Sequence, residues 1–158
     1  MNLESHLSAA VGYLELGMAE DANAELEQLP PDLKIHPEVL ALRASIFAAI
    51  EAWEHLLELS VFLTSKWPQD SQHWIWLGYA TRRCRSIAEA EKALISSLRY
   101  HDSEPIIHFN LACYAAQTAD LETARKRLAH AIRMDPQIRE MALTDPDLEP
   151  LWGILRNP

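Results

Sequence analysis

Residues 73–84 read HWIWLGYATRRC, and residues 107–118, which lie 34 positions further on, read IHFNLACYAAQT. The second residue of both stretches is a bulky ring, followed three and four positions later by leucine and a small residue. In the first stretch these positions are Trp74, Leu77 and Gly78. Because residues i, i+3 and i+4 share one face of a helix, both stretches predict a helix that packs closely against a neighbour.

The same spacing extends along most of the chain. Pro37 and Pro105 are separated by twice this distance, as are Pro68 and Pro136. The chain divides without an insertion into blocks 3–36, 37–70, 71–104 and 105–138, and the small residue recurs as Ala10, Ala44, Gly78 and Ala112. Each block predicts two antiparallel helices, and neighbouring pairs must stack because a single pair cannot bury its apolar faces. The expected helices are 3–15 with 19–29, 37–49 with 53–65, 71–83 with 87–99, and 105–117 with 121–133.

This pattern resembles that of the tetratricopeptide repeat (TPR) family, over about residues 3–138. The third block carries it as Trp74, Leu77, Gly78, Ala90 and Leu94, and the fourth as His108, Leu111, Ala112, Ala124, Leu128, Ala131 and Pro136. The family's unit is a helix-turn-helix of about 34 residues. The resemblance implies an all-α, right-handed α-solenoid of about four repeats.

The C-terminal stretch, residues 139–158, leaves the repeat and is expected to cap it. Residues 137–144 predict a helix that stops at Asp145-Pro146, and apolar residues recur after Pro150. The stretch therefore predicts a cap on the fourth repeat, although residues 145–158 could instead lie in the groove or on a second copy. Pro30-Pro31 predicts a short linker at 30–36, and residues 1–158 are expected to form a single domain.

Composition excludes several classes of protein. The 49% hydrophobic and 23% charged residues predict a folded interior, and the apolar stretches are too short to span a membrane. No secretory signal is visible, so we expect a cytoplasmic protein. The net charge is −9, with −6 and −3 in the first two blocks, +1 in each of the next two, and −2 in residues 139–158. An acidic chain without a basic stripe is a poor partner for nucleic acid.

The candidate binding surface follows from the resemblance, because the first helix of each TPR unit lines a concave groove. The groove residues implied for this chain are Leu42, Ile75, Trp76, Tyr79, Arg82, Arg83, Ile106, Phe109, Asn110 and Cys113. Arginine and aromatic side chains dominate many binding sites, so the two arginines are expected to bind a ligand carboxylate. Two alternatives remain open: the aromatic residues could pack between adjacent helices, and the arginines could pair with Glu89 or Glu91.

The leading hypothesis is a noncatalytic module that binds an apolar or amphipathic peptide segment of another protein in this groove. The lysines and asparagines with which some TPR proteins clamp acidic chaperone tails are missing, because the matching positions are Leu7, Val11, Leu42, Gln72 and Trp76. Bacterial secretion chaperones resemble the chain in composition. A self-assembling scaffold is the alternative, in which the acidic N-terminal units meet the third and fourth units of another copy.

No catalytic or cofactor motif is found. The sequence lacks a Gly-rich phosphate loop, a nucleophile elbow and histidines spaced for a metal, so we expect no enzyme, no cofactor and no metal site. Cys84 and Cys113 stand alone inside expected helices, which favours reduced, apolar side chains.

Overall fold

The computed structural model describes residues 2–157, and all regular elements among them are helices. The all-α prediction is confirmed. The helices of the four repeats are α1 (Leu3–Glu15), α2 (Ala19–Glu27), α4 (Pro37–Ala49), α5 (Trp53–Lys66), α6 (Ser71–Cys84), α7 (Ile87–His101), α8 (Pro105–Gln117) and α9 (Leu121–Met134). The other elements are the short helix α3 (Pro31–Lys34), α10 (Ile138–Thr144), the 3₁₀ helix η1 (Pro146–Leu151) and α11 (Trp152–Arg156).

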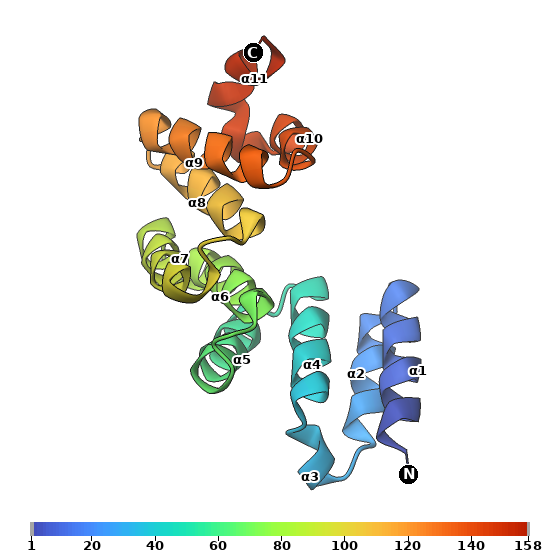
Figure 1. The fold of residues 1–158 in the computed structure, drawn as a ribbon. Helices are drawn as coiled ribbons and strands as arrows, with labels where there is room; N and C mark the ends of the chain where they lie inside the picture. The colour runs from blue at the N-terminus through green and yellow to red at the C-terminus, as the bar shows by residue number, and fades with distance from the viewer. Residues whose placement is uncertain (1, 158) are drawn as a thin grey trace. The chain divides into compact units, whose positions relative to one another are not determined.

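The chain forms two compact units, Met1–Trp67 and Pro68–Pro158. In the first, α1, α2 and α4 lie side by side, and α5 pairs with α4 (Figure 1). In the second, α6 pairs with α7, α7 contacts α8, and α8 pairs with α9. Each unit has its own apolar core, built on Leu26 and Ile46 in the first and on Leu94 and Leu111 in the second. The boundary between the two units, after Trp67, lies close to the expected end of the second repeat at residue 70. That residues 1–158 form a single domain stays a prediction.

The same backbone turn joins the two helices of repeats one, two and four. Its central residue has a positive φ of 75° at Gly17, 56° at Glu51 and 64° at Ala119, which occupy the same position of their repeats. The next amide donates back to the helix in each case, as in the bond of 2.9 Å from the Met18 nitrogen to the Tyr13 oxygen. The equivalent bonds are Ala52 to Phe47 and Asp120 to Ala115. This Schellman arrangement satisfies the last carbonyls of the first helix and turns the chain back on itself.

The bulky ring that recurs at Trp74 and His108 makes the same kind of hydrogen bond in both repeats. Trp74 Nε1 donates to the Pro68 carbonyl at 2.9 Å, and His108 Nε2 donates to the Asp102 carbonyl at 2.7 Å, which is the equivalent pair one repeat later. Arg127 donates to His108 Nδ1 at 3.3 Å, so this ring is held neutral, and burial lowers its pKa. Each ring thus ties the start of a repeat to the linker before it.

Close helix packing explains the small residue of the repeat. A Cβ placed on Gly78 would lie 3.0 Å from the Tyr114 hydroxyl and 3.2 Å from the Leu94 side chain. Tyr114 comes from α8 and Leu94 from α7, so α6 meets both helices at this point. A side chain at this position would therefore force the Tyr114 and Leu94 side chains to shift by a few tenths of an ångström.

The last residues cap the fourth repeat, as expected. Ile138, Ala142 and Leu148 are fully buried in the core of the second unit. The helix α10 and η1 both contact α8 and α9, and the red C-terminal end of the ribbon follows them in Figure 1. Ten consecutive residues of α8, 107–116, are buried as a result. A helix that is apolar on all sides needs neighbours on all sides, which the C-terminal segment helps to provide.

Several boundaries differ from the sequence-based expectation. The helix α2 ends at Glu27 rather than at residue 29, and the linker 30–36 contains α3, because Pro31 can occupy the first turn of a helix. The stop expected at Asp145-Pro146 is followed directly by the 3₁₀ helix η1, in which Pro150 has no backbone N–H to donate.

Replacing Gly78 by valine is expected to lower the free energy of unfolding by about 1–3 kcal/mol, because the added carbons collide with Leu94 and Tyr114. Denaturant unfolding measures the change. The matched control is Gly12→Val in α1, where a Cβ meets nothing within 4 Å, and its effect should stay within about 0.5 kcal/mol. Equal effects of the two substitutions would contradict the close packing.

Replacing Ala119 by glycine is expected to raise the free energy of unfolding by about 0.5–1 kcal/mol. The left-handed backbone costs an alanine about 1–2 kcal/mol, which exceeds the extra chain entropy that glycine loses on folding. The opposite sign is expected for Ala88→Gly, on the exposed surface of α7. Thermal unfolding of both variants measures whether each substitution raises or lowers the free energy of unfolding. Destabilisation by Ala119→Gly would contradict a left-handed backbone at this residue.

Candidate functional site

Nine of the ten predicted groove residues lie in the second unit, on α6 and α8, and the tenth, Leu42, lies on α4 in the first unit. Leu42 packs partly buried against the core of its own unit. Five of the nine, Tyr79, Arg82, Arg83, Asn110 and Cys113, line one polar pocket of about 460 Å³. The pocket therefore lies between α6 and α8, and five residues that the TPR resemblance places on one surface do line it together.

The C-terminal segment completes this pocket. Asp145 and Asp147 line it together with Tyr114 from α8. Arg82 donates from Nη1 to Asp147 Oδ2 and from Nη2 to Asp147 Oδ1, the second bond at 3.0 Å. Gln117 also donates to the Asp147 backbone carbonyl, at 3.3 Å. The pocket is therefore closed on one side by the chain's own acidic turn.

The electrostatics of the pocket favour this closure. The hydrogen bonds to Asp147 raise the pKa of the Arg82 guanidinium, so this side chain is charged at neutral pH. Arg82 also lies 5.7 Å from the centre of the Tyr114 ring. Burial raises the pKa of the Tyr114 hydroxyl, which stays protonated. One of the two predicted ligand-binding arginines is thus already bound to a carboxylate.

Asn110 brings an unpartnered donor into the pocket. Its side chain is 7% exposed, and its amide nitrogen Nδ2 has no hydrogen-bond partner among the described residues. A buried amide that donates no bond loses about 1–3 kcal/mol relative to one that is satisfied. A carbonyl or carboxylate oxygen placed in the pocket would remove this penalty.

Cys113, Asp145 and Asp147 form a possible metal-binding group, since one ligand atom from each lies within 4.8 Å of the others. The residues fit a cation poorly, because Arg82 already neutralises Asp147. Burial and the two nearby carboxylates also raise the pKa of the Cys113 thiol, whereas a thiol must lose its proton to bind a metal. The Cys113 sulfur lies 3.8 Å from Asp145 as a weak donor instead.

The apolar groove residues divide into exposed and buried sets. Tyr79 is 42% exposed, and its ring lies 5.3 Å from the Arg83 guanidinium carbon. Trp76 is half-buried and stacks on His73 with a centroid distance of 6.0 Å. Ile75 and Phe109 are buried in the core, so they support the surface rather than form it. Ile106 is half-buried beside the same core.

Sequence reasoning missed Tyr114, Asp145 and Asp147. Tyr114 directly follows Cys113 on α8, and the repeat column gave no sign that it would reach Gly78. The sequence signal for the acidic turn was limited to the four acidic residues of the tail and the two neighbouring arginines of α6. Long-range pairing of this kind has no fixed spacing.

Comparison with known proteins identifies the fold. No family model matches the chain, and no curated protein matches it in sequence. The structure is similar to the crystal structure of TTC0263, a thermophilic TPR protein of Thermus thermophilus, with a TM-score of 0.76 and 18% sequence identity. The match covers 98% of this chain and 83% of that protein. The chain has a TPR fold.

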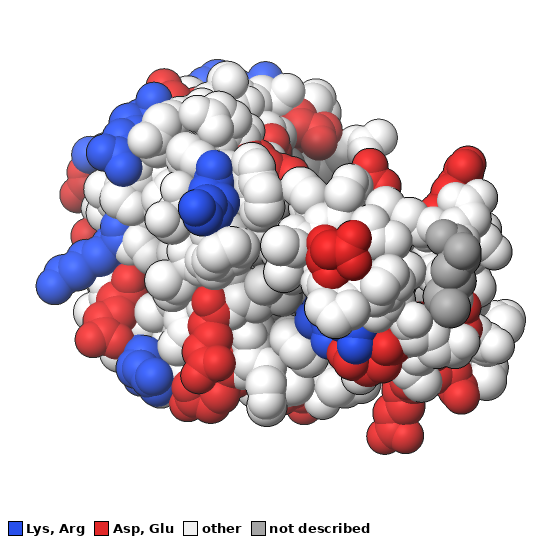
Figure 2. Space-filling model, turned by 90° about the horizontal axis from the view of Figure 1, so that it is seen from below, with Lys and Arg blue, Asp and Glu red and all other residues white. Residues whose placement is uncertain are grey.

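The TPR fold confirms the interpretation of the sequence period as a helical repeat, and the predicted pocket residues lie on the first helices of repeats three and four. No helix among residues 2–157 combines the length and the apolar character that crossing a membrane requires. Figure 2 shows one face of the molecule, on which basic side chains are scattered and do not form a stripe.

The acidic turn is expected to protect Cys113 from thiol reagents, because the sulfur is buried beneath it and its pKa is raised. The substitution Asp147→Asn removes the charge that Arg82 binds and should make the closed position of the turn less stable by about 1–2 kcal/mol. Cys113 is then exposed more often, and its modification should be about 5- to 30-fold faster. Mass spectrometry after timed alkylation measures the rates at Cys84 and Cys113 separately.

The matched control is Glu149→Gln, an exposed carboxylate in the same 3₁₀ helix. It should leave the alkylation rate of Cys113 within about twofold of the rate in the wild-type protein, because surface substitutions change stability by less than about 0.5 kcal/mol. Equal acceleration by both variants would show that the pair of Arg82 and Asp147 does not hold the turn.

Proposed function

We propose that this protein is a noncatalytic interaction module whose second unit binds an amphipathic peptide segment of another protein. The supporting observation is the pocket between α6 and α8, in which the buried Asn110 amide nitrogen has no hydrogen-bond partner among residues 2–157 and lies near exposed aromatic surface. A volume of about 460 Å³ is in the range of sites that hold small ligands or a few peptide side chains.

Each part of the proposed ligand has a counterpart on this surface. A peptide carbonyl would accept the N–H of Asn110, while apolar side chains would cover Trp76, Tyr79 and Ile106. A ligand carboxylate would approach Arg83, whose guanidinium lies over the Tyr79 ring at the edge of the pocket. The combination of apolar surface and cationic rim favours an amphipathic segment over a purely apolar one.

The fold supports this assignment. The residues lie on the first helix of each repeat, and the resemblance to the TPR family implies that these helices carry the binding groove. The same proposal includes a cytoplasmic location, an acidic scaffold without a cofactor, and no role in nucleic-acid binding. The net charge of −9 opposes a phosphate backbone.

Isothermal titration against a library of amphipathic and extended apolar peptides tests the proposal. The substitution Trp76→Ala is expected to weaken binding by about 1–3 kcal/mol, or about 5- to 150-fold in Kd, because the peptide loses the largest partly exposed ring of this surface. Preference for extended apolar peptides would instead favour a chaperone of the secretion type.

The control is Ile95→Ala, which shortens an exposed apolar side chain on α7 and should leave Kd unchanged. A second variant, Asn110→Leu, has a similar volume but no amide, and it is expected to weaken binding without destabilising the fold, since no intramolecular bond from Nδ2 is lost. Equal affinities of the wild type and Trp76→Ala for every peptide would remove this surface as the binding site.

A further inference from the structure

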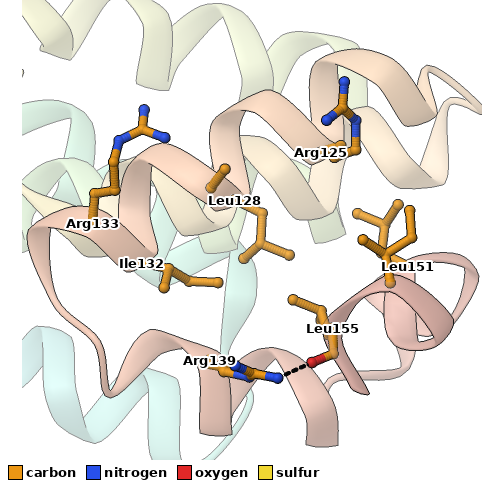
Figure 3. A pocket seen from close by; sticks show the side chains of 9 residues that line it. Arg125, Leu128, Ile132, Arg133, Arg139, Leu151 and Leu155 are labelled. Carbon is orange, nitrogen blue, oxygen red and sulfur yellow. Dashed lines mark hydrogen bonds between the residues drawn. The ribbon is translucent and has the colours of Figure 1, made fainter. Parts of the chain in front are cut away.

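A second pocket lies between α9 and the C-terminal segment. Its volume is about 340 Å³. Figure 3 shows Leu128, Ile132, Leu151 and Leu155 pointing toward a common space, and Arg139 is held at its edge by a bond to the Leu155 carbonyl. Ile154 completes the apolar lining and is 55% exposed.

The rim of this pocket is basic. Arg125 and Arg133 are exposed on α9, and their separation in sequence places them about 12 Å apart along the helix. Arg139 from α10 is the third, and no acidic residue is found among the described side chains that line the pocket. An apolar floor with three guanidinium groups at its border fits an apolar side chain that is flanked by carboxylates.

One segment of the chain has this chemistry. Residues 15–21 read ELGMAED and span the turn between α1 and α2, together with the adjoining helix ends; they are called the 15–21 turn here. Leu16 is 75% exposed, more than any other large apolar residue of the described chain, and Met18 is 42% exposed. Glu15, Glu20 and Asp21 are exposed beside them.

The two units also differ in charge. Residues 1–67 carry 11 acidic and three basic side chains, for a net charge of −8, and residues 68–158 carry 12 and 11, for a net charge of −1. Two of the three basic residues, Lys34 and Arg43, both pair with Glu27. The 15–21 turn therefore lies in a unit with strong excess negative charge, which would attract the three arginines of another copy.

We infer that the pocket between α9 and α11 receives the 15–21 turn of a second copy of this chain, so that copies associate head to tail. Leu16 enters the apolar lining, and the acidic residues beside it face Arg125, Arg133 and Arg139. Because the pocket and the turn are different surfaces, a dimer still has one unused pocket and one unused turn. Further copies can therefore add at both ends unless the assembly closes into a ring. This association is independent of peptide binding on α6 and α8.

Sedimentation equilibrium of the full chain over a range of concentrations tests the inference. The average mass is expected to rise with concentration at an ionic strength of about 0.05 M and to fall back toward the monomer at about 0.5 M, where charges are screened. A wild-type protein that stays monomeric up to millimolar concentration would overturn it.

Two variants separate the surfaces. Leu16→Ser removes the apolar side chain of the turn without adding a charge, and the double variant Arg125→Glu/Arg133→Glu reverses the rim, so each is expected to weaken association about tenfold or more. The matched controls are Val61→Ser, at another exposed apolar position of the first unit, and Lys92→Glu/Arg99→Glu on the surface of α7. Circular dichroism confirms that each variant is folded.

The decisive arm mixes the two defective variants. The arginine variant retains an intact turn and the Leu16 variant retains an intact pocket, so a mixture is expected to form a dimer that neither protein forms alone. A mixture that remains monomeric, or association of the wild type that survives the arginine reversals, would overturn the inference. Loss of association in the controls would do the same.

Discussion

The turn that ends the first helix of a repeat is the constraint on which the rest of the structure depends. A residue with positive φ at Gly17, Glu51 and Ala119 reverses the chain, and the amide after it donates back to the helix. Once the turn is fixed, the second helix must run antiparallel to the first. The third repeat has a negative φ at the equivalent residue, Arg85, and there the small residue at Gly78 allows α6, α7 and α8 to approach closely.

The repeat creates a surface that the chain partly covers itself. The helix α10 and η1 pack against α8 and α9 of the fourth repeat and help to bury residues 107–116 of α8. The same segment carries Asp147 to Arg82, where a bidentate ion pair holds it. Capping and closure of the polar pocket are therefore consequences of one segment, which leaves Trp76 and Tyr79 of the predicted groove partly or largely exposed.

The helices could be predicted from sequence because their signals are local and recur. Recurring columns of small and bulky residues placed most helix ends within one or two residues, and turn chemistry explains why. The short helix α3 was missed, because a single turn after Pro31 has no periodicity to detect. The division into two apolar cores was also not visible, since it depends on which helices touch and not on the pattern inside each one.

The candidate site was only partly predictable. The repeat columns brought Tyr79, Arg82, Asn110 and Cys113 into one group, and these residues do line one pocket. The columns could not distinguish a groove side chain from a buried one, because Ile75 and Phe109 belong to the same columns and lie in the core. Nor could they show that the partner of Arg82 comes from the same chain.

Hydrogen exchange of the backbone amides tests the central claim most directly, namely that the chain's own C-terminal segment helps to enclose α8. Peptides that cover residues 107–116 should exchange more slowly than those of α1 and α11, because ten consecutive residues of α8 are buried. Exchange of α8 as rapid as that of α11 would contradict the account, since the fourth repeat would then be open and its pocket unformed.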